Sequence, residues 1–153
     1  MIKTDIKTAE AIDQEFNFGS IDIGEQLEID ELNELRFLVI RYNQLNGEIP
    51  SQIGNLNNLF ALVISSTSLE GEIPVDIWNL EELGILAITD NQLTGNIPSN
   101  IQNLTNLFNL IINNTQVSGA LPDEIWGLPK LLQLNLQNNQ SNLIHLSYKQ
   151  FHL

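Results

Sequence analysis

The sequence predicts a right-handed solenoid of the α/β class, with short parallel strands on a concave face and turns with short 3-10 or α helices on the convex side. Three observations predict it. Each unit alternates apolar and variable residues over a strand-length segment, and a Gly follows, with Pro three residues after it. A leucine recurs every 24 residues, at Leu32, Leu56, Leu80, Leu104 and Leu128. Four successive copies in register indicate coils that stack on one shared core.

The strand comes first in each unit. Strand side chains alternate between two sides, so every second residue is expected to fill the interior. The interior residues are Leu38, Leu62, Leu86, Leu110 and Leu134, each followed two residues later by Ile or Leu. Because one coil cannot bury its apolar side alone, we expect each strand to pair in parallel with the strand of the next unit.

The return half of each unit needs a turn and a short helical step. Gly permits a tight turn, and the Pro that follows it ends strand pairing. The step from Ile53 to Leu56 fits one turn of 3-10 helix on the convex side. A Leu-rich helical protein is the alternative, and it is disfavoured because Gly and Pro recur in every unit.

A polar column follows the strands at Asn43, Thr67, Asn91, Thr115 and Asn139. The chain leaves the sheet here, and its main-chain groups lose their ladder partners. Buried amides and hydroxyls can satisfy those groups, so we expect this column to be structural. The alternation of Asn and Thr indicates a double unit of 48 residues.

Three regions are expected. Residues 1–31 lack the repeat and are rich in acids, and we expect an acidic N-terminal cap there, with an interaction arm as the alternative. Residues 32–141 form the repeats. Residues 142–153 are a degenerate tail that either folds over the last coil or marks a piece of a longer array, and an open end there could support self-association.

Composition restricts the function. The net charge of −13 disfavours nucleic acid, and no apolar run is long enough for membrane insertion. The chain has no cysteine, and its two histidines, His145 and His152, lie in the tail. No catalytic, phosphate-binding or metal-binding motif is present, so we expect neither enzymatic activity nor a cofactor or bound metal.

Residues 35–56 read L-x-x-L-x-I-x-x-N-x-L-x-G-x-I-P-x-x-I-G-x-L. This run resembles the plant-type leucine-rich repeats of receptor-kinase ectodomains and polygalacturonase-inhibiting proteins, and the resemblance extends over residues 29–141. It implies a leucine-rich-repeat solenoid, a receptor-like binding role and an extracellular or cell-surface location. This chain has no cysteines for the paired caps that plant ectodomains usually carry.

The outward residues between the strand leucines are the candidate partner-binding residues. They form a first column of Phe37, Ala61, Ile85, Asn109 and Gln133. The central column is Val39, Val63, Ala87, Ile111 and Asn135. The third is Arg41, Ser65, Thr89, Asn113 and Gln137, and Tyr42, Asp90, Phe60 and Phe108 flank the columns.

These columns predict an apolar strip on the first repeats and amides on the last two. Arg41, the cation of the columns, could clamp a carboxylate of a partner, but the simpler expectation is an ion pair with an acid such as Glu34.

We therefore expect a non-catalytic recognition module that binds a protein, peptide or glycan through the concave face. One alternative is a structural or surface-adsorbing repeat protein that contacts a cell surface, ice or mineral. Another is a fragment of a larger receptor-like protein.

Overall fold

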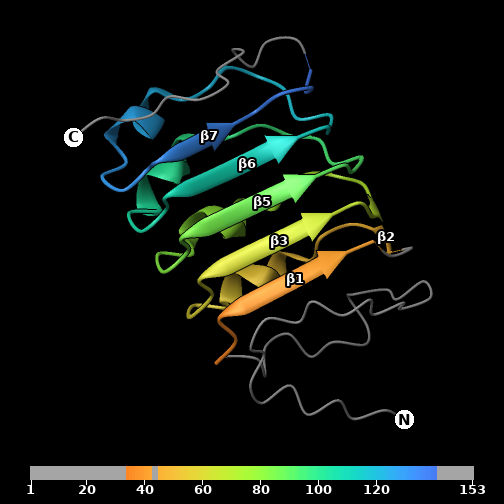
Figure 1. The fold of residues 1–153 in the computed structure, drawn as a ribbon, viewed down its shortest axis with the longest axis horizontal. Helices are drawn as coiled ribbons and strands as arrows, with labels where there is room; N and C mark the ends of the chain where they lie inside the picture. Colours follow the sequence, from red (N-terminus) through yellow and green to blue (C-terminus); the bar gives the residue numbers. More distant parts are fainter. Residues whose placement is uncertain (1–33, 43–44, 141–153) are drawn as a thin grey trace.

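The computed structural model describes residues 34–42 and 45–140. Three predicted features lie outside these residues: the N-terminal cap (1–31), Asn43 and the degenerate tail (142–153). The predicted self-association through the tail therefore stays a prediction. The described chain forms successive coils, in which β1, β3, β5 and β6 are each followed by a turn and a 3-10 helix, and β7 is the last described element. Figure 1 shows the strands side by side and pointing the same way, with the 3-10 helices behind the sheet.

The main sheet has five parallel strands in the order β1-β3-β5-β6-β7. Their bounds are β1 Phe37–Arg41, β3 Ala61–Ser65, β5 Ile85–Thr89, β6 Asn109–Asn113 and β7 Gln133–Asn135. Each residue pairs with the residue 24 positions later, as Leu62 pairs with Leu86 and Leu86 with Leu110. The predicted interior column is thus in register.

One apolar core runs through the stack. Leu62, Leu86 and Leu110 are fully buried, whereas Leu38 in the first described strand is only partly buried. The neighbouring coils exclude water from each leucine, which one coil cannot do for itself. The side that faces away from the core carries the candidate site.

The return half of each coil has the predicted turn and helix. The Gly residues of the turns, Gly47, Gly71, Gly95 and Gly119, have φ between 79° and 95°, a left-handed conformation that side chains disfavour. The 3-10 helices are η2 Ser51–Asn55, η3 Val75–Asn79, η4 Ser99–Asn103 and η5 Asp123–Gly127, and each follows a proline. Sequence patterning did not predict the second, two-stranded sheet of β2 (Asn46–Gly47) and β4 (Ser68–Leu69).

Candidate ligand-binding face

The strand face is the outward side of the main sheet, and we define it by the three columns of side chains between the buried leucines. The register sets Val39 opposite Val63 and Ala87 opposite Ile111, and it aligns the other columns in the same way. Gln137 follows the end of β7 at the third column. The candidate residues therefore lie together on one surface of the sheet.

The part of the strand face on β1, β3 and β5 is mainly apolar. Phe37 is 38% exposed, and Val39, Val63, Ile85 and Ala87 are partly exposed. Because these side chains are exposed in part, water contacts a row of hydrocarbon. Such a surface favours contact with apolar groups of a partner.

Ala61 corrects one expectation. It was predicted to contact a partner, but it is only 4% exposed. The sheet places its methyl group between the larger Phe37 and Ile85 in the first column. Ala61 is therefore a spacer beneath its neighbours and is not available to a ligand.

Amide side chains occupy the other part of the strand face, on and after β6 and β7. They are Asn109, Asn113, Gln133, Asn135 and Gln137, all partly exposed. The Oδ1 atoms of Asn109 and Asn113 are buried without a hydrogen-bond partner. Because each Oδ1 is buried, the remaining polar group of these two side chains is the Nδ2 donor.

The hydroxyls of the third column are already paired. Ser65 Oγ and Thr89 Oγ1, on adjacent strands, lie 2.8 Å apart and share a hydrogen bond. This pair holds two neighbouring side chains in place and leaves fewer free donors on the apolar part of the face.

Three phenylalanines form a row at the beginning of the strands, which we call the aromatic row: Phe37, Phe60 and Phe108. The ring centroids of Phe37 and Phe60 are 5.8 Å apart in an edge arrangement, and those of Phe60 and Phe108 are 5.9 Å apart. Gly84 lies between the last two rings, and a Cβ there would come within 2.8 Å of both. The absent side chain at Gly84 lets these rings approach each other.

Arg36 was not among the predicted site residues. Its guanidinium carbon lies 5.9 Å from the ring centroids of both Phe37 and Phe60, within cation–π range. The signal was present in the sequence, because position 36 begins the column that contains Phe60 and Phe108. The sequence shows that this column contains one Arg, but it does not show that the guanidinium lies near the two rings.

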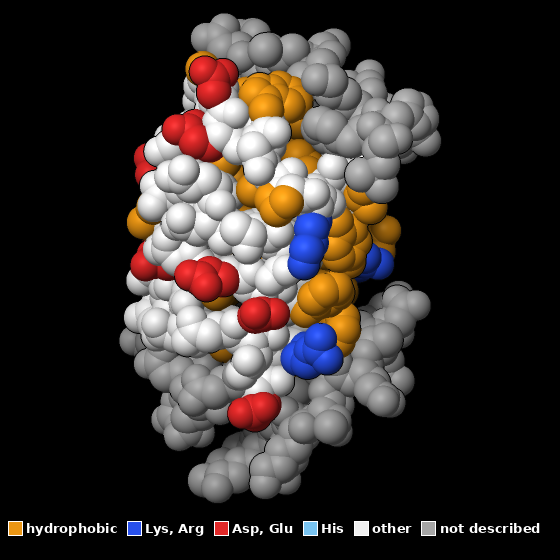
Figure 2. Space-filling model, turned by 90° about the vertical axis from the view of Figure 1, so that its left-hand side faces the viewer, with side chains coloured by type: hydrophobic (Ala, Val, Ile, Leu, Met, Phe, Trp, Pro, Cys, Tyr) orange, Lys and Arg blue, Asp and Glu red, His pale blue; other side chains and the backbone are white. Residues whose placement is uncertain are grey.

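One expected contact of Arg41, the ion pair with Glu34, is not formed. Within residues 34–42 and 45–140, no ion pair joins Arg41 to Glu34. Figure 2 shows a strip of hydrophobic side chains with basic side chains along its border, while acidic side chains lie mainly elsewhere in that view.

The turns after the strands expose a second set of polar groups. The first residue of each turn has a positive φ of 50–56°: Tyr42, Ser66, Asp90, Asn114 and Asn138. Asn114 Nδ2 donates to Asp90 Oδ1 at 2.7 Å, and Asn138 Nδ2 donates to Asn114 Oδ1 at 2.7 Å. Tyr42, at the other end of this column, is 75% exposed.

Below these turns lie the described members of the predicted polar column. Asn91 Nδ2 donates to the carbonyls of Ile64 and Thr89, and its Oδ1 accepts from the Thr67 hydroxyl. Asn139 repeats this arrangement, since it accepts from Thr115 and donates to the carbonyls of Ile112 and Leu136. These side chains satisfy main-chain groups inside the turns, which places them among the structural residues of the coil.

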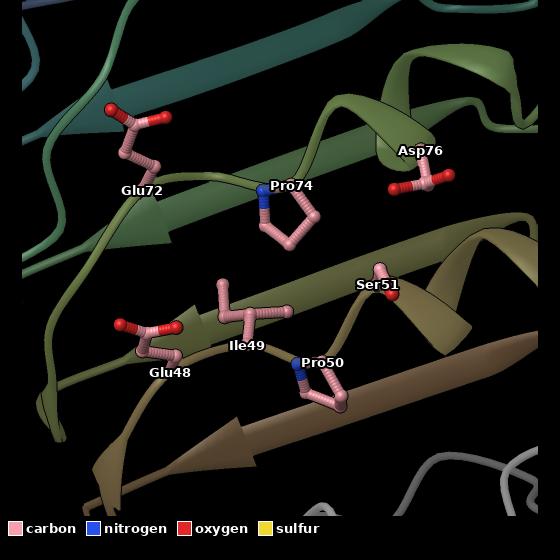
Figure 3. Close-up of a pocket in the computed structure, with 7 residues that line it drawn as sticks. All are labelled: Glu48, Ile49, Pro50, Ser51, Glu72, Pro74 and Asp76. Carbon is pink, nitrogen blue, oxygen red and sulfur yellow. The ribbon is translucent and has the colours of Figure 1, made fainter.

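A hollow lies away from the strand face, between two return legs. It is lined by Glu48, Ile49, Pro50, Ser51, Glu72, Pro74 and Asp76. Figure 3 shows Glu48 and Glu72 at one end and Asp76 at the other, so the three carboxylates do not converge on a single point. Among the described residues, no group of three or more His, Cys, Asp or Glu is placed to hold a metal ion.

The fold and this face define a repeat protein with one variable surface. Residues 24–142 match the family described as leucine-rich repeat region. The chain belongs to the leucine-rich repeat family. The repeats are of the plant receptor-like type, as the solved structures below indicate.

Several solved structures are similar over most of the chain. The ectodomain of the receptor kinase GASSHO1/SCHENGEN3 from Arabidopsis thaliana, in complex with CASPARIAN STRIP INTEGRITY FACTOR 2, is 36% identical with a TM-score of 0.71. That match covers 75% of this chain and 14% of the ectodomain chain. The Arabidopsis receptor kinase HAESA, in complex with the peptide hormone IDA and the co-receptor SERK1, is 35% identical with a TM-score of 0.71, over 72% of this chain and 19% of that one.

A plant ice-binding protein is also similar, at 33% identity and a TM-score of 0.65, over 69% of this chain and 34% of that one. The chain therefore spans between about one seventh and one third of the length of these three proteins. No curated protein matches the sequence. Among the described residues, none of the helices has the length and apolar character needed to cross a membrane.

Proposed function

We propose that this chain is a non-catalytic recognition module that binds a peptide or a peptide segment of a protein through the strand face. The observation that carries the proposal is the row of partly exposed apolar side chains beside partly exposed amides on one face of a parallel sheet. The apolar part can bury side chains of a ligand, and the amides can bond to its main chain. Two of the similar receptor kinases were solved with a peptide hormone or a named factor bound, which supports a ligand of this class.

The dimensions of the face favour a peptide over a large folded partner. Five strands at ~4.8 Å spacing, with about five residues each, give on the order of 300 Å² of flat surface. A standard interface needs roughly 800 Å² from each protein. An extended segment of about six residues spans the same width, at ~3.3 Å per residue.

A display selection tests this proposal. Random peptides are selected against the immobilised chain, and the enriched sequences are synthesised and titrated by isothermal calorimetry. The variant Val63→Glu places a charge in the middle of the central column, where Val63 is partly exposed. The matched control is Gln52→Glu, which adds the same charge to the exposed surface of η2 behind the sheet.

We expect Val63→Glu to weaken binding about tenfold or more, equivalent to ~1.4 kcal/mol, and Gln52→Glu to change it less than about twofold. Circular dichroism checks that both variants remain folded. Failure to enrich any binding peptide, or equal weakening by both variants, contradicts the proposal.

The similarity to a plant ice-binding protein supports one alternative, adsorption to ice. Growth of ice crystals in the presence of the chain distinguishes the two functions. Shaped or arrested crystals, together with no peptide enrichment, favour adsorption.

We further propose an extracellular or cell-surface location, because similar structures are ectodomains of receptor kinases. The sequence pattern supports a division of the chain into an N-terminal cap (1–31), the repeats (32–141) and a degenerate tail (142–153).

A further inference from the structure

The strand face has a charge opposite to that of the chain. The chain carries 19 acidic residues, but none of the 15 positions in the three columns is Asp or Glu. Two arginines bracket β1, since Arg36 immediately precedes it and Arg41 ends it. Positive charge therefore gathers at the β1 end of a face that is otherwise neutral.

Within the described ranges, both guanidinium groups lie apart from carboxylates. Among the described residues, neither guanidinium forms an ion pair with a carboxylate. The guanidinium carbon of Arg36 lies 5.9 Å from the ring centroids of both Phe37 and Phe60, within cation–π range of the aromatic row. Such contact leaves the N–H edge of a guanidinium free to bind a carboxylate in two-point fashion.

The amide part of the face also offers hydrogen-bond donors. Asn109 and Asn113 bury their acceptor oxygens, so the remaining polar group of each partly exposed side chain is an N–H donor. The hydroxyls of Ser65 and Thr89 are paired with each other. Acceptors of a ligand, such as carboxylates and main-chain carbonyls, complement the donors of Arg36, Asn109 and Asn113.

Resting on the proposed function, we propose that the ligand is an acidic, apolar peptide segment. Its carboxylate side chain meets Arg36 beside the aromatic row, and Arg41 at the other end of β1 adds positive charge to the same strand. A neighbouring apolar side chain packs on the aromatic row and Val39, and main-chain carbonyls accept hydrogen bonds from the amides of β6.

The net charge of −13 opposes an acidic ligand at long range. Salt at about 0.15 M screens charges beyond about 8 Å, so the repulsion from distant carboxylates is weak at that ionic strength. The two effects predict opposite responses to salt. Attraction by the arginines weakens as salt is added, whereas repulsion by the whole chain is relieved.

The test uses three pools of eight-residue peptides with acetylated and amidated ends. The pools are identical mixtures of Phe, Leu, Val, Gly and Asn, except that one central position is Glu, Gln or Lys. Binding of the fluorescently labelled full chain to each immobilised pool is measured. We expect the Glu pool to bind about two- to fivefold more strongly than the Gln pool, and the Lys pool to bind most weakly.

The double variant Arg36→Gln with Arg41→Gln should lose the preference for Glu, whereas Arg36→Lys alone and the Gln52→Glu control should keep it. The preference should also shrink as salt rises. A preference that survives in the double variant, grows with salt or is absent in the original chain overturns the inference and leaves peptide binding intact. If no pool binds, the proposed function fails as well, and binding of a uronic acid oligomer would then identify a glycan ligand.

Discussion

Asn91 offers the sharpest test of how the coils are held together. It is 7% exposed, and its side chain makes three hydrogen bonds: two donated to the carbonyls of Ile64 and Thr89, and one accepted from Thr67. Asn91→Ala removes all three. The Thr89 carbonyl still accepts from the Ser66 N–H at 3.0 Å, so its loss is partly covered.

Each hydrogen bond contributes about 1 kcal/mol net, and a buried carbonyl left unpaired costs about 1–3 kcal/mol. Asn91→Ala should therefore lower the free energy of unfolding by about 2–4 kcal/mol. Urea unfolding followed by circular dichroism measures this loss. The control is Asn57→Ala at an exposed site, which should change stability by less than about 0.5 kcal/mol. A loss below about 1 kcal/mol for Asn91→Ala would refute the reasoning.

The same column should couple in pairs. Thr67 bonds to Asn91, and Thr115 bonds to Asn139, whereas no hydrogen bond joins Asn91 to Thr115 within the described chain. A double-mutant cycle of Thr67→Val with Asn91→Ala should give a coupling energy of about 0.5–3 kcal/mol. The cycle of Asn91→Ala with Thr115→Val should give a value near zero, and equal couplings would contradict the pairing.

Three further predictions concern the core and the aromatic row. Leu86→Ala should cost about 2–5 kcal/mol in urea unfolding because Leu86 is fully buried in the middle of the stack; a cost under about 1 kcal/mol would contradict this position. Gly84→Ala should cost about 1–3 kcal/mol by the same assay, since a Cβ there lies 2.8 Å from two rings; an unchanged midpoint would show that the rings yield freely. Trp78 is 1% exposed and Trp126 is 39% exposed, so acrylamide should quench fluorescence less in Trp126→Phe than in Trp78→Phe; equal quenching would argue against this packing.

The repeat spacing was enough to predict the architecture. A period of 24 residues placed Leu62, Leu86 and Leu110 in one column, and the sheet register agrees with it. Gly and Pro at fixed positions predicted the turns. Gly allows a left-handed backbone conformation, and Pro fixes φ and lacks an N–H donor, so both effects follow from residue type alone. The short sheet of β2 and β4 was missed, since pairing over two residues leaves no periodic signal.

The details of the strand face could not be predicted, because they depend on how side chains of different coils meet. Ala61 occupies an outward position but is shielded by larger neighbours. Arg36 leans over two rings instead of lying alone at the edge. Position in a repeat therefore predicts which way a residue faces, while exposure and charge pairing follow from the sizes of its neighbours.

The aromatic row shows how the double unit affects the exposed face. Phe60 and Phe108 belong to coils two strands apart, a separation of about 9.6 Å at ordinary strand spacing. Their ring centroids are only 5.9 Å apart, so the rings must lean toward each other across the intervening coil. That coil contributes Gly84, where any side chain would occupy the space that the rings use. The aromatic row therefore depends on a small residue in the alternate coil, and the 48-residue period that pairs Thr with Asn inside the turns also spaces these rings on the surface.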